Sequence, residues 1–251
     1  MTCGVKLRIG TSGWHYKHWK GLFYPTRFPA AKMLEWYASQ FDTVEINNTF
    51  YQLPNPEALA VWRQTVSSSF LFSVKASRFI THMKKLRDPE NAVAVFFERV
   101  LVLKPKLGPV LFQLPPRWPV NYARLDEFFS VLPRGHRYVV EFREKSWCCP
   151  EVYSILRRHE VAVCLHDWGG SAWPMELTAG FTYVRMHGPT GAYHGKYEDF
   201  MLRKWADRIR EWEGKLSEVY VYFNNDIGGH AIRNAIELKG MLLGAMPAKV
   251  A

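Results

Sequence analysis

Two charged residues stand where an apolar segment of this sequence ends. The segment YVVEFR (138–143) begins with residues typical of a buried strand, yet it carries Glu141 and Arg143. Charged side chains are rarely buried unless they are paired. We therefore expect this carboxylate and this guanidinium to find partners at the ends of other strands, among Glu45, Lys75, Asp167, Arg185, His187 and Asn225.

The same arrangement recurs along the chain. Alternate residues of a strand share a face, so a polar face is expected wherever polar residues lie two apart. Such residues are predicted to point together toward one end of the sheet: Glu45, Asn47 and Thr49; Glu141 and Arg143; Arg185 and His187. Further ionisable or amide residues follow other strand-like segments: Lys75, Asp167 and Asn225.

These residue types suit acid–base chemistry on an anionic substrate. Lys75, Arg143 and Arg185 are predicted to bind the anion, since a guanidinium matches phosphate or carboxylate. Glu141 or His187 is the candidate general base, and Glu45 or Asp167 the candidate acid. Four further residues complete the predicted substrate-binding set: Asn225, Trp14, Tyr193 and Tyr197.

Aromatic residues gather in the segments that follow the strands, where they suit sugar rings or nucleobases. They are Trp14, Tyr16, Trp19, Phe50, Tyr51, Trp118, Trp147, Trp168, Tyr193 and Tyr197. Individually, each is expected to pack the rim of the fold. The glycine-rich segment HGPTGAYHGKY (187–197) is a candidate lid over the substrate.

Two other site chemistries stay open. Glu45, Glu141, Asp167 and His187 form a set that could hold a divalent metal, but no HxH or HExxH motif supports it and three cations oppose it. We therefore predict no cofactor. A net charge of +10 and the basic segment KASRFITHMKKLR (75–87) keep nucleic acid as a possible partner.

The elements that position these residues alternate regularly. Eight strand-like segments are expected: 7–14, 43–51, 70–77, 108–116, 138–143, 161–168, 182–189 and 219–226. Helical patterns lie between most of them, at 30–41, 55–66, 91–108, 123–133, 149–160, 199–215 and 230–244. The pattern predicts an α/β fold, the (β/α)8 TIM barrel. An open doubly wound sheet is the rival, but no GxGxxG motif follows the first strand.

Length and composition agree with one domain covering residues 1–251. The four cysteines, Cys3, Cys148, Cys149 and Cys164, show no metal-binding spacing and are expected to be free thiols. No apolar run is long enough for a membrane span, and the first residues do not resemble a signal peptide. These features predict a cytoplasmic protein without a membrane partner, and they leave its oligomeric state open.

Several blocks resemble the YecE-like family, a group of unknown function. They are GTSGWHYKHWKGLFYP, TVEINNTFYQLP, FLFSVKASRFITH, LGPVLFQLPP, VVEFREKSW, YVRMHG, and YVYFNND followed by GHAIRNA. The resemblance runs in fixed order from Ile9 to about Leu242. It implies a TIM barrel and assigns no reaction.

The residues and the resemblance together favour an enzyme that acts on a small phosphorylated or sugar-like substrate at the C-terminal ends of the strands. The alternative is a metal-dependent or nucleic-acid-directed hydrolase or binding protein.

Overall fold

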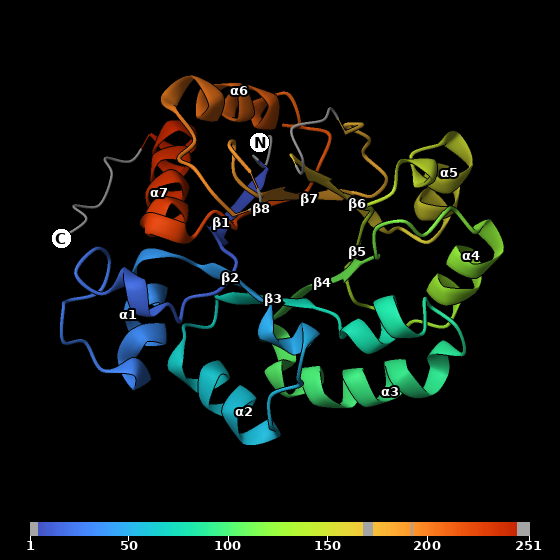
Figure 1. The fold of residues 1–251 in the computed structure, drawn as a ribbon, viewed down its shortest axis with the longest axis horizontal. Coiled ribbons are helices and arrows are strands. Elements are labelled where there is room, and N and C mark those ends of the chain that lie inside the picture. The colour runs from blue at the N-terminus through green and yellow to red at the C-terminus, as the bar shows by residue number, and fades with distance from the viewer. Residues whose placement is uncertain (1–4, 168–172, 192, 245–251) are drawn as a thin grey trace. The chain divides into compact units, whose positions relative to one another are not determined.

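The computed structural model describes residues 5–167, 173–191 and 193–244. Within these ranges the eight predicted strands are all present (Figure 1). They are β1 Lys6–Thr11, β2 Thr43–Ile46, β3 Leu71–Lys75, β4 Leu107–Gln113, β5 Tyr138–Glu141, β6 Ala162–His166, β7 Phe181–Met186 and β8 Glu218–Phe223. Their order in the sheet, β1-β8-β7-β6-β5-β4-β3-β2, follows the chain order. The predicted fold class, a (β/α)8 TIM barrel, is confirmed.

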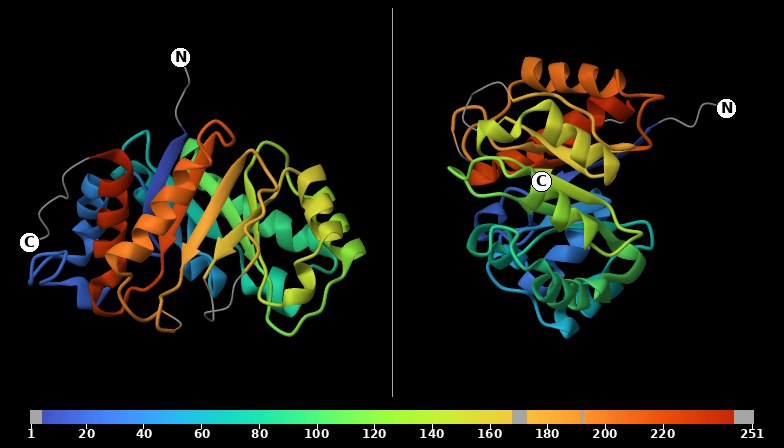
Figure 2. Two further views of the ribbon diagram at one scale, coloured as in Figure 1. Left: turned by 90° about the horizontal axis from the view of Figure 1, so that it is seen from above. Right: turned by 90° about the vertical axis from the view of Figure 1, so that its right-hand side faces the viewer.

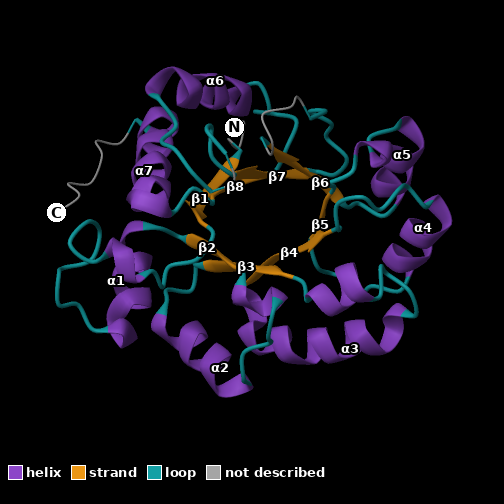
Figure 3. Cartoon of the chain, in the orientation of Figure 1, coloured by secondary structure: helices purple, strands orange, loops and turns teal. Residues whose placement is uncertain are grey.

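Helices follow most of the strands, as the sequence predicts (Figure 3). They are α1 Met33–Gln40, α2 Pro56–Thr65, α3 Pro89–Val100, α4 Tyr122–Ser130, α5 Pro150–Arg158, α6 Asp199–Arg210 and α7 His230–Leu243. The described residues between β6 and β7 contain no helix, in agreement with the weak helical pattern there. None of the helices in the described ranges is long and apolar enough to cross a membrane.

One predicted helix is too long. The pattern over 91–108 predicts a single helix, but α3 ends at Val100 and a tight turn, Leu101–Lys106, leads into β4. Pro105 lies in this turn, and Lys104 before it has a φ of 51°. Proline lacks an N–H and disfavours α-helical geometry at the residue before it, so the helix cannot continue.

The chain divides into two compact units, which are described separately. The first comprises residues up to Glu45, His166–Trp173 and the chain from Tyr183 onward. Here β1 and β8 pair in parallel, from Lys6 beside Glu218 to Thr11 beside Phe223. Helix α7 packs on both strands and against α6, and the two helices lie side by side in Figure 2.

A glycine in β1 allows a close backbone approach in this first unit. A Cβ atom at Gly10 would lie 2.4 Å from the carbonyl oxygen of Thr43. The hydroxyl of Tyr37 fills the adjoining space, where it accepts from Thr11 N at 2.9 Å and donates to Thr43 O at 3.1 Å. The start of β2 is thereby held at the end of β1 that leads to Ser12.

The second unit comprises Ile46–Leu165 and Pro174–Thr182. Its strands β3, β4, β5 and β6 pair in parallel, with Gln113 beside Glu141 at one end of the ladder. Both faces of these strands carry buried apolar side chains, as is typical of a parallel sheet covered by helices. The charged residues at their C-terminal ends are therefore exceptions to the local pattern.

Candidate functional site

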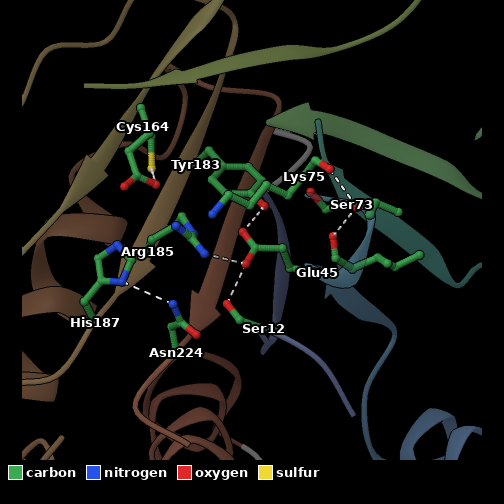
Figure 4. Close-up of polar contacts among 12 residues, drawn as sticks. Ser12, Glu45, Ser73, Lys75, Cys164, Tyr183, Arg185, His187 and Asn224 are labelled. Carbon is green, nitrogen blue, oxygen red and sulfur yellow. Dashed lines mark hydrogen bonds and ion pairs between the residues drawn. The ribbon is translucent and has the colours of Figure 1, made fainter. Parts of the chain in front are cut away.

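In the first unit, a buried carboxylate is surrounded by three hydrogen-bond donors (Figure 4). Glu45 Oε2 accepts from Ser12 Oγ at 2.6 Å and from Arg185 Nη2 at 2.9 Å. Glu45 Oε1 accepts from Tyr183 Oη at 2.7 Å. The Glu45 side chain is fully buried and that of Arg185 is 2% exposed. Glu45 and Arg185, both predicted site residues at strand ends, therefore form an ion pair in this unit.

Strand geometry explains this network. Tyr183 and Arg185 lie two residues apart in β7, so their side chains share one face. Burial raises the pKa of the Glu45 carboxyl, but the charge of Arg185 and the three hydrogen bonds outweigh burial and lower the pKa overall. Glu45 is thus held as a carboxylate, which suits an electrostatic role better than the predicted role of proton donor.

His187 follows β7 directly and is 1% exposed. Its Nδ1 lies 3.3 Å from Asn224 Nδ2, and because an amide nitrogen only donates, Nδ1 is the acceptor. This contact leaves the proton of the neutral ring on Nε2. The rings of His166 and Tyr193 each lie 6.0 Å from the His187 ring. His187 is therefore a buried imidazole among aromatic neighbours, as a candidate general base would be.

Asp167 fixes the backbone after β7. Its Oδ1 accepts from His187 N at 2.8 Å, and its Oδ2 accepts from the Tyr197 hydroxyl. Tyr197 Oη in turn accepts from Gly188 N at 2.7 Å. Burial and the adjacent Asp167 charge raise the pKa of Tyr197, so its hydroxyl remains a donor. This geometry suits a positioning role for both residues.

Asn225 likewise holds the backbone of the segment 187–197, through Gly195. Its Nδ2 donates to Gly195 O at 2.8 Å and to Asn234 Oδ1 at 3.0 Å. Asn234 also holds Tyr197 through both of its backbone groups. The segment predicted as a lid is therefore tied to α7 at its described residues 193–197.

The sequence interpretation gave no role to Ser12, Tyr183 or Asp226 in the first unit, and it named Tyr16 only as a loop aromatic. Ser12 donates to Glu45. Tyr16 donates to Ser12 O at 2.6 Å, and its pKa is raised by burial and by the nearby charges of Asp226 and Glu45. Asp226, whose pKa is raised by burial, lies 3.5 Å from His18 Nε2. The block TSGWHY was the available signal, because it brings a hydroxyl, a phenol and an imidazole just after β1.

In the second unit, the two charged residues of the segment YVVEFR pair with each other. Arg143 Nη2 forms an ion pair with Glu141 Oε1, and these side chains are 5% and 0% exposed. Cys164 Sγ lies 3.9 Å from the other carboxylate oxygen of Glu141. However, β5 ends at Glu141, so Arg143 belongs to the following loop and reaches back toward the strand. The partner of the buried carboxylate is thus local.

A cationic cluster surrounds Phe50 and His82 in the same unit. Lys75 Nζ lies 4.1 Å from the centre of the Phe50 ring, and the His82 ring lies 4.9 Å from it, edge to face. Burial, followed by the positive charges of Lys75, Arg78 and Arg143, lowers the pKa of His82 to about 4. We call Lys75, Arg78 and Arg143 the cationic cluster. Burial and this cluster together keep the His82 ring neutral well below pH 7.

Two predicted polar residues are not part of a strand. Strand β2 ends at Ile46, Asn47 has helical backbone angles and Thr49 lies in the turn Asn48–Phe50. The alternation expected for Glu45, Asn47 and Thr49 is therefore wrong. Thr49 Oγ1 instead donates to Lys75 O at 2.6 Å, which fixes the end of β3 beside the cationic cluster.

Several of the loop aromatics are packing residues, as expected for each of them singly. Trp19 and Trp147 are fully buried, and Trp147 stacks on Phe142 at 5.3 Å. Tyr51 is 74% exposed, and Trp168 lies outside the described residues. Trp14 is half-buried, and its carbonyl oxygen accepts from Tyr24 Oη at 2.5 Å. Cys148, Cys149 and Cys164 are free thiols, as predicted, and Cys3 lies outside the described residues.

The described residues contain no group of three or more His, Cys, Asp or Glu side chains placed to hold a metal ion. The predicted metal set of Glu45, Glu141, Asp167 and His187 therefore gains no support from the geometry. The prediction that all the strand-end residues share one pocket stays a prediction.

Comparison with known proteins shows to which family this chain belongs. The family described as "Protein of unknown function DUF72" matches residues 8–249. This chain belongs to that family. The resemblance to YecE-like proteins is confirmed, because the chain is 34% identical over 138 residues to the UPF0759 protein YecE of Escherichia coli K12. That match covers 55% of this chain and 48% of YecE, so the chain spans about half the length of that relative.

Other relatives match over nearly the whole chain. The UPF0759 protein YunF of Bacillus subtilis is 27% identical over 273 residues, covering 94% of each chain. The crystal structure of a DUF72 family protein from Thermotoga maritima matches with a TM-score of 0.87 and 26% identity, over 95% of this chain and 99% of that one. A DUF72 family protein from Enterococcus faecalis matches with a TM-score of 0.78 and 20% identity, over 96% and 99%. These relatives support the fold, and their names state no reaction.

Proposed function

We propose that this protein is an enzyme acting on a small phosphorylated or sugar-like substrate. The observation that carries the proposal is the cationic cluster around a neutral histidine and an aromatic ring. Lys75 ends β3, Arg78 lies three residues after it and Arg143 follows β5, and all three charges act on His82. These cations together create a positive potential that attracts an anion, although Glu141 pairs with Arg143.

The types of side chain fit a sugar phosphate. Arginine and lysine supply the charge-assisted donors that phosphate oxygens accept. The Phe50 ring offers an apolar face of the kind on which a sugar ring packs, between Lys75 and His82. His82 is neutral at pH 7, so its ring can donate a hydrogen bond to a substrate oxygen without adding charge.

Glu141 is suited to orienting Arg143. Their buried ion pair fixes the guanidinium, and removing either partner would leave an unpaired buried charge. For the first unit we propose His187 as a general base in its own right, since Asn224 fixes its tautomer and Asp167 holds its backbone. Glu45 is proposed to stabilise the positive charge of Arg185, its ion-pair partner, during the reaction.

Binding measurements test the cationic cluster directly. Calorimetric titration with glucose 6-phosphate, inorganic phosphate and glucose should show that both phosphates bind and that glucose binds more weakly. Replacing Arg78 by alanine should weaken phosphate binding about tenfold, because a hydrogen bond to a charged group contributes about 1.5–3 kcal/mol. Arg78 is exposed, so this change should leave the fold intact.

Lys84→Ala is the matched control. Lys84 lies in the same basic segment, but its ammonium pairs with Asp88 at 3.6 Å. Equal affinity of the Arg78 and Lys84 variants for phosphate would contradict the proposed anion site. Turnover is tested by following sugar phosphates incubated with the protein by phosphorus NMR. Conversion that is lost in His187→Gln supports an enzyme, whereas binding without any conversion would indicate a binding protein instead.

A further inference from the structure

Helix α6 carries a second stripe of residues that the fold does not bury. Its inner stripe, Leu202, Ala206 and Ile209, is fully packed in the first unit. The second stripe follows helical spacing on another face and combines apolar and basic residues: Phe200, Met201, Lys204, Trp205 and Arg208. Phe200 is 55% exposed, an unusual position for an aromatic residue with only a packing role.

A cavity of about 360 Å³ lies along this stripe. Gly188, Pro189, Tyr197 and Asp167 also line it. The volume falls within the range of small-molecule sites. The cavity is therefore lined by aromatic and basic side chains of α6 and by the hydrogen-bonded pair Asp167 and Tyr197.

The two cations of the stripe differ from the other basic residues on α6. Arg203 pairs with Asp199 at 2.6 Å, and Arg210 pairs with Asp207 at 2.7 Å. Lys204 and Arg208 have no carboxylate partner among the residues that the structure describes. Lys204 Nζ lies 5.6 Å from the centre of the Phe200 ring, and Arg208 Cζ lies 5.6 Å from that of Trp205. Each cation thus stands beside an aromatic face with its charge uncompensated by an acid.

We infer that this cavity binds a nucleoside phosphate. Aromatic side chains stack on a flat base, and neighbouring lysine and arginine side chains bind phosphate oxygens. Lys204 and Arg208 are four residues apart, one helical turn, so one phosphate group can contact both. The Asp167 carboxylate repels phosphate but accepts hydrogen bonds from hydroxyl groups. The ribose is therefore expected beside Asp167, and the phosphate beside Lys204 and Arg208 of α6.

This site is separate in its residues from the cationic cluster of the proposed function. It adjoins the segment that holds His187, because Asp167 accepts from His187 N and Tyr197 accepts from Gly188 N. Occupancy of the cavity thus acts on the same hydrogen bonds that fix the residue after β7. The ligand chemistry has two sources, a free nucleotide or a nucleotide within a single strand of nucleic acid.

Calorimetric titration of the full chain with AMP, adenosine, inorganic phosphate and a single-stranded oligoadenylate tests the inference. AMP should bind more tightly than adenosine or phosphate alone. The double variant Lys204→Ala/Arg208→Ala should bind AMP at least tenfold more weakly, and Trp205→Leu should also weaken binding. The control Arg203→Ala/Arg210→Ala removes two cations from the same helix and should leave the affinity unchanged.

The outcomes separate the sources and the two proposals. Equal affinity for AMP and for the oligonucleotide per site identifies a free nucleotide, whereas much tighter, strongly salt-dependent oligonucleotide binding identifies a strand. Either result supports the site. Undetectable AMP and oligonucleotide binding, or unchanged affinity in the Lys204/Arg208 variant, overturns it. Arg78→Ala should not alter AMP binding at this cavity. A failure of the nucleotide-site inference can therefore be distinguished from a failure of the proposed sugar-phosphate site.

Discussion

Among the residues that the structure describes, three carboxylates are almost fully buried, and each lies against an arginine. Glu45 pairs with Arg185, Glu141 with Arg143, and Glu218 with Arg8 at 3.0 Å. A buried ion pair gains little net stability, but removing one partner leaves an uncompensated charge. The Arg8–Glu218 pair starts at the first residue of β8, whereas Glu45 and Arg185 lie toward the ends of their strands. The Arg8–Glu218 pair is therefore assigned to structure, and the Glu45–Arg185 pair stays the candidate for function.

Replacing Glu45 by glutamine should destabilise the fold by about 3–5 kcal/mol, because Arg185 would be left buried without its counter-charge. Urea denaturation measures the free energy of unfolding. The control Glu35→Gln alters an exposed carboxylate in α1 and should change stability by less than about 0.5 kcal/mol. Similar stabilities for the two variants would show that the Glu45–Arg185 pair contributes no more than a surface charge.

His82 makes stability depend on pH. Its pKa falls from 6.5 in the unfolded chain to about 4 in the folded protein. Between these values the unfolded chain binds a proton that the folded protein does not, so stability decreases as pH falls from 6.5 to 4. The free energy of unfolding of His82→Gln should fall less over this window than that of the wild type. Parallel curves for the two proteins would argue against the depressed pKa.

At the scale of elements, strand and helix order was predictable, because apolar runs and helical spacing recur strongly in the sequence. The ends of the elements were less predictable than their order: β2 ends at Ile46, and α3 ends before Pro105. The need of Glu141 for a charged partner was predictable, but that partner is Arg143 in the following loop and not a residue of another strand. Ser12, Tyr183 and His82 were not found, since a hydroxyl or a ring gains its role only from neighbours that folding brings from distant segments.

The turn after β7 depends on one glycine. Gly188 has a φ of 115°, and a Cβ atom there would lie 2.2 Å from His194 O. Gly188→Ala should therefore destabilise the protein by at least about 1 kcal/mol and displace the loop that carries Tyr193 and Tyr197. Thermal unfolding and the tyrosine signals in NMR spectra measure both effects.

Gly180→Ala provides the matched comparison, because a Cβ atom at Gly180 would meet no other atom within 4 Å. It should be nearly neutral. If the Gly188 and Gly180 variants unfold at the same temperature, the close approach inferred at Gly188 is absent in solution.

At the scale of the whole molecule, the net charge of +10 raises the local concentration of anions around the protein. This field is a general property of the sequence and does not identify a site, whereas the cationic cluster and the α6 cavity are specific arrangements. The family assignment and the fold likewise leave the reaction undefined, because TIM barrels host many chemistries.

The salt dependence of binding should separate the electrostatic contribution to the binding free energy from the other contributions. Raising sodium chloride from 50 to 500 mM should weaken glucose 6-phosphate binding several-fold, because mobile ions screen exposed charges. Glucose binding should stay constant, which provides the internal control. Calorimetry at the two salt concentrations measures both, and salt-independent binding of the phosphate would contradict a charge-led mode.

The central claim is that the cationic cluster around His82 binds the anionic group of a substrate. Its most direct test is the pKa of His82, measured by NMR titration of the imidazole with and without glucose 6-phosphate. The free protein should give a value of about 4, and the bound anion should raise it by offsetting the charges of Lys75, Arg78 and Arg143. An identical His82 titration at saturating sugar phosphate would contradict the account.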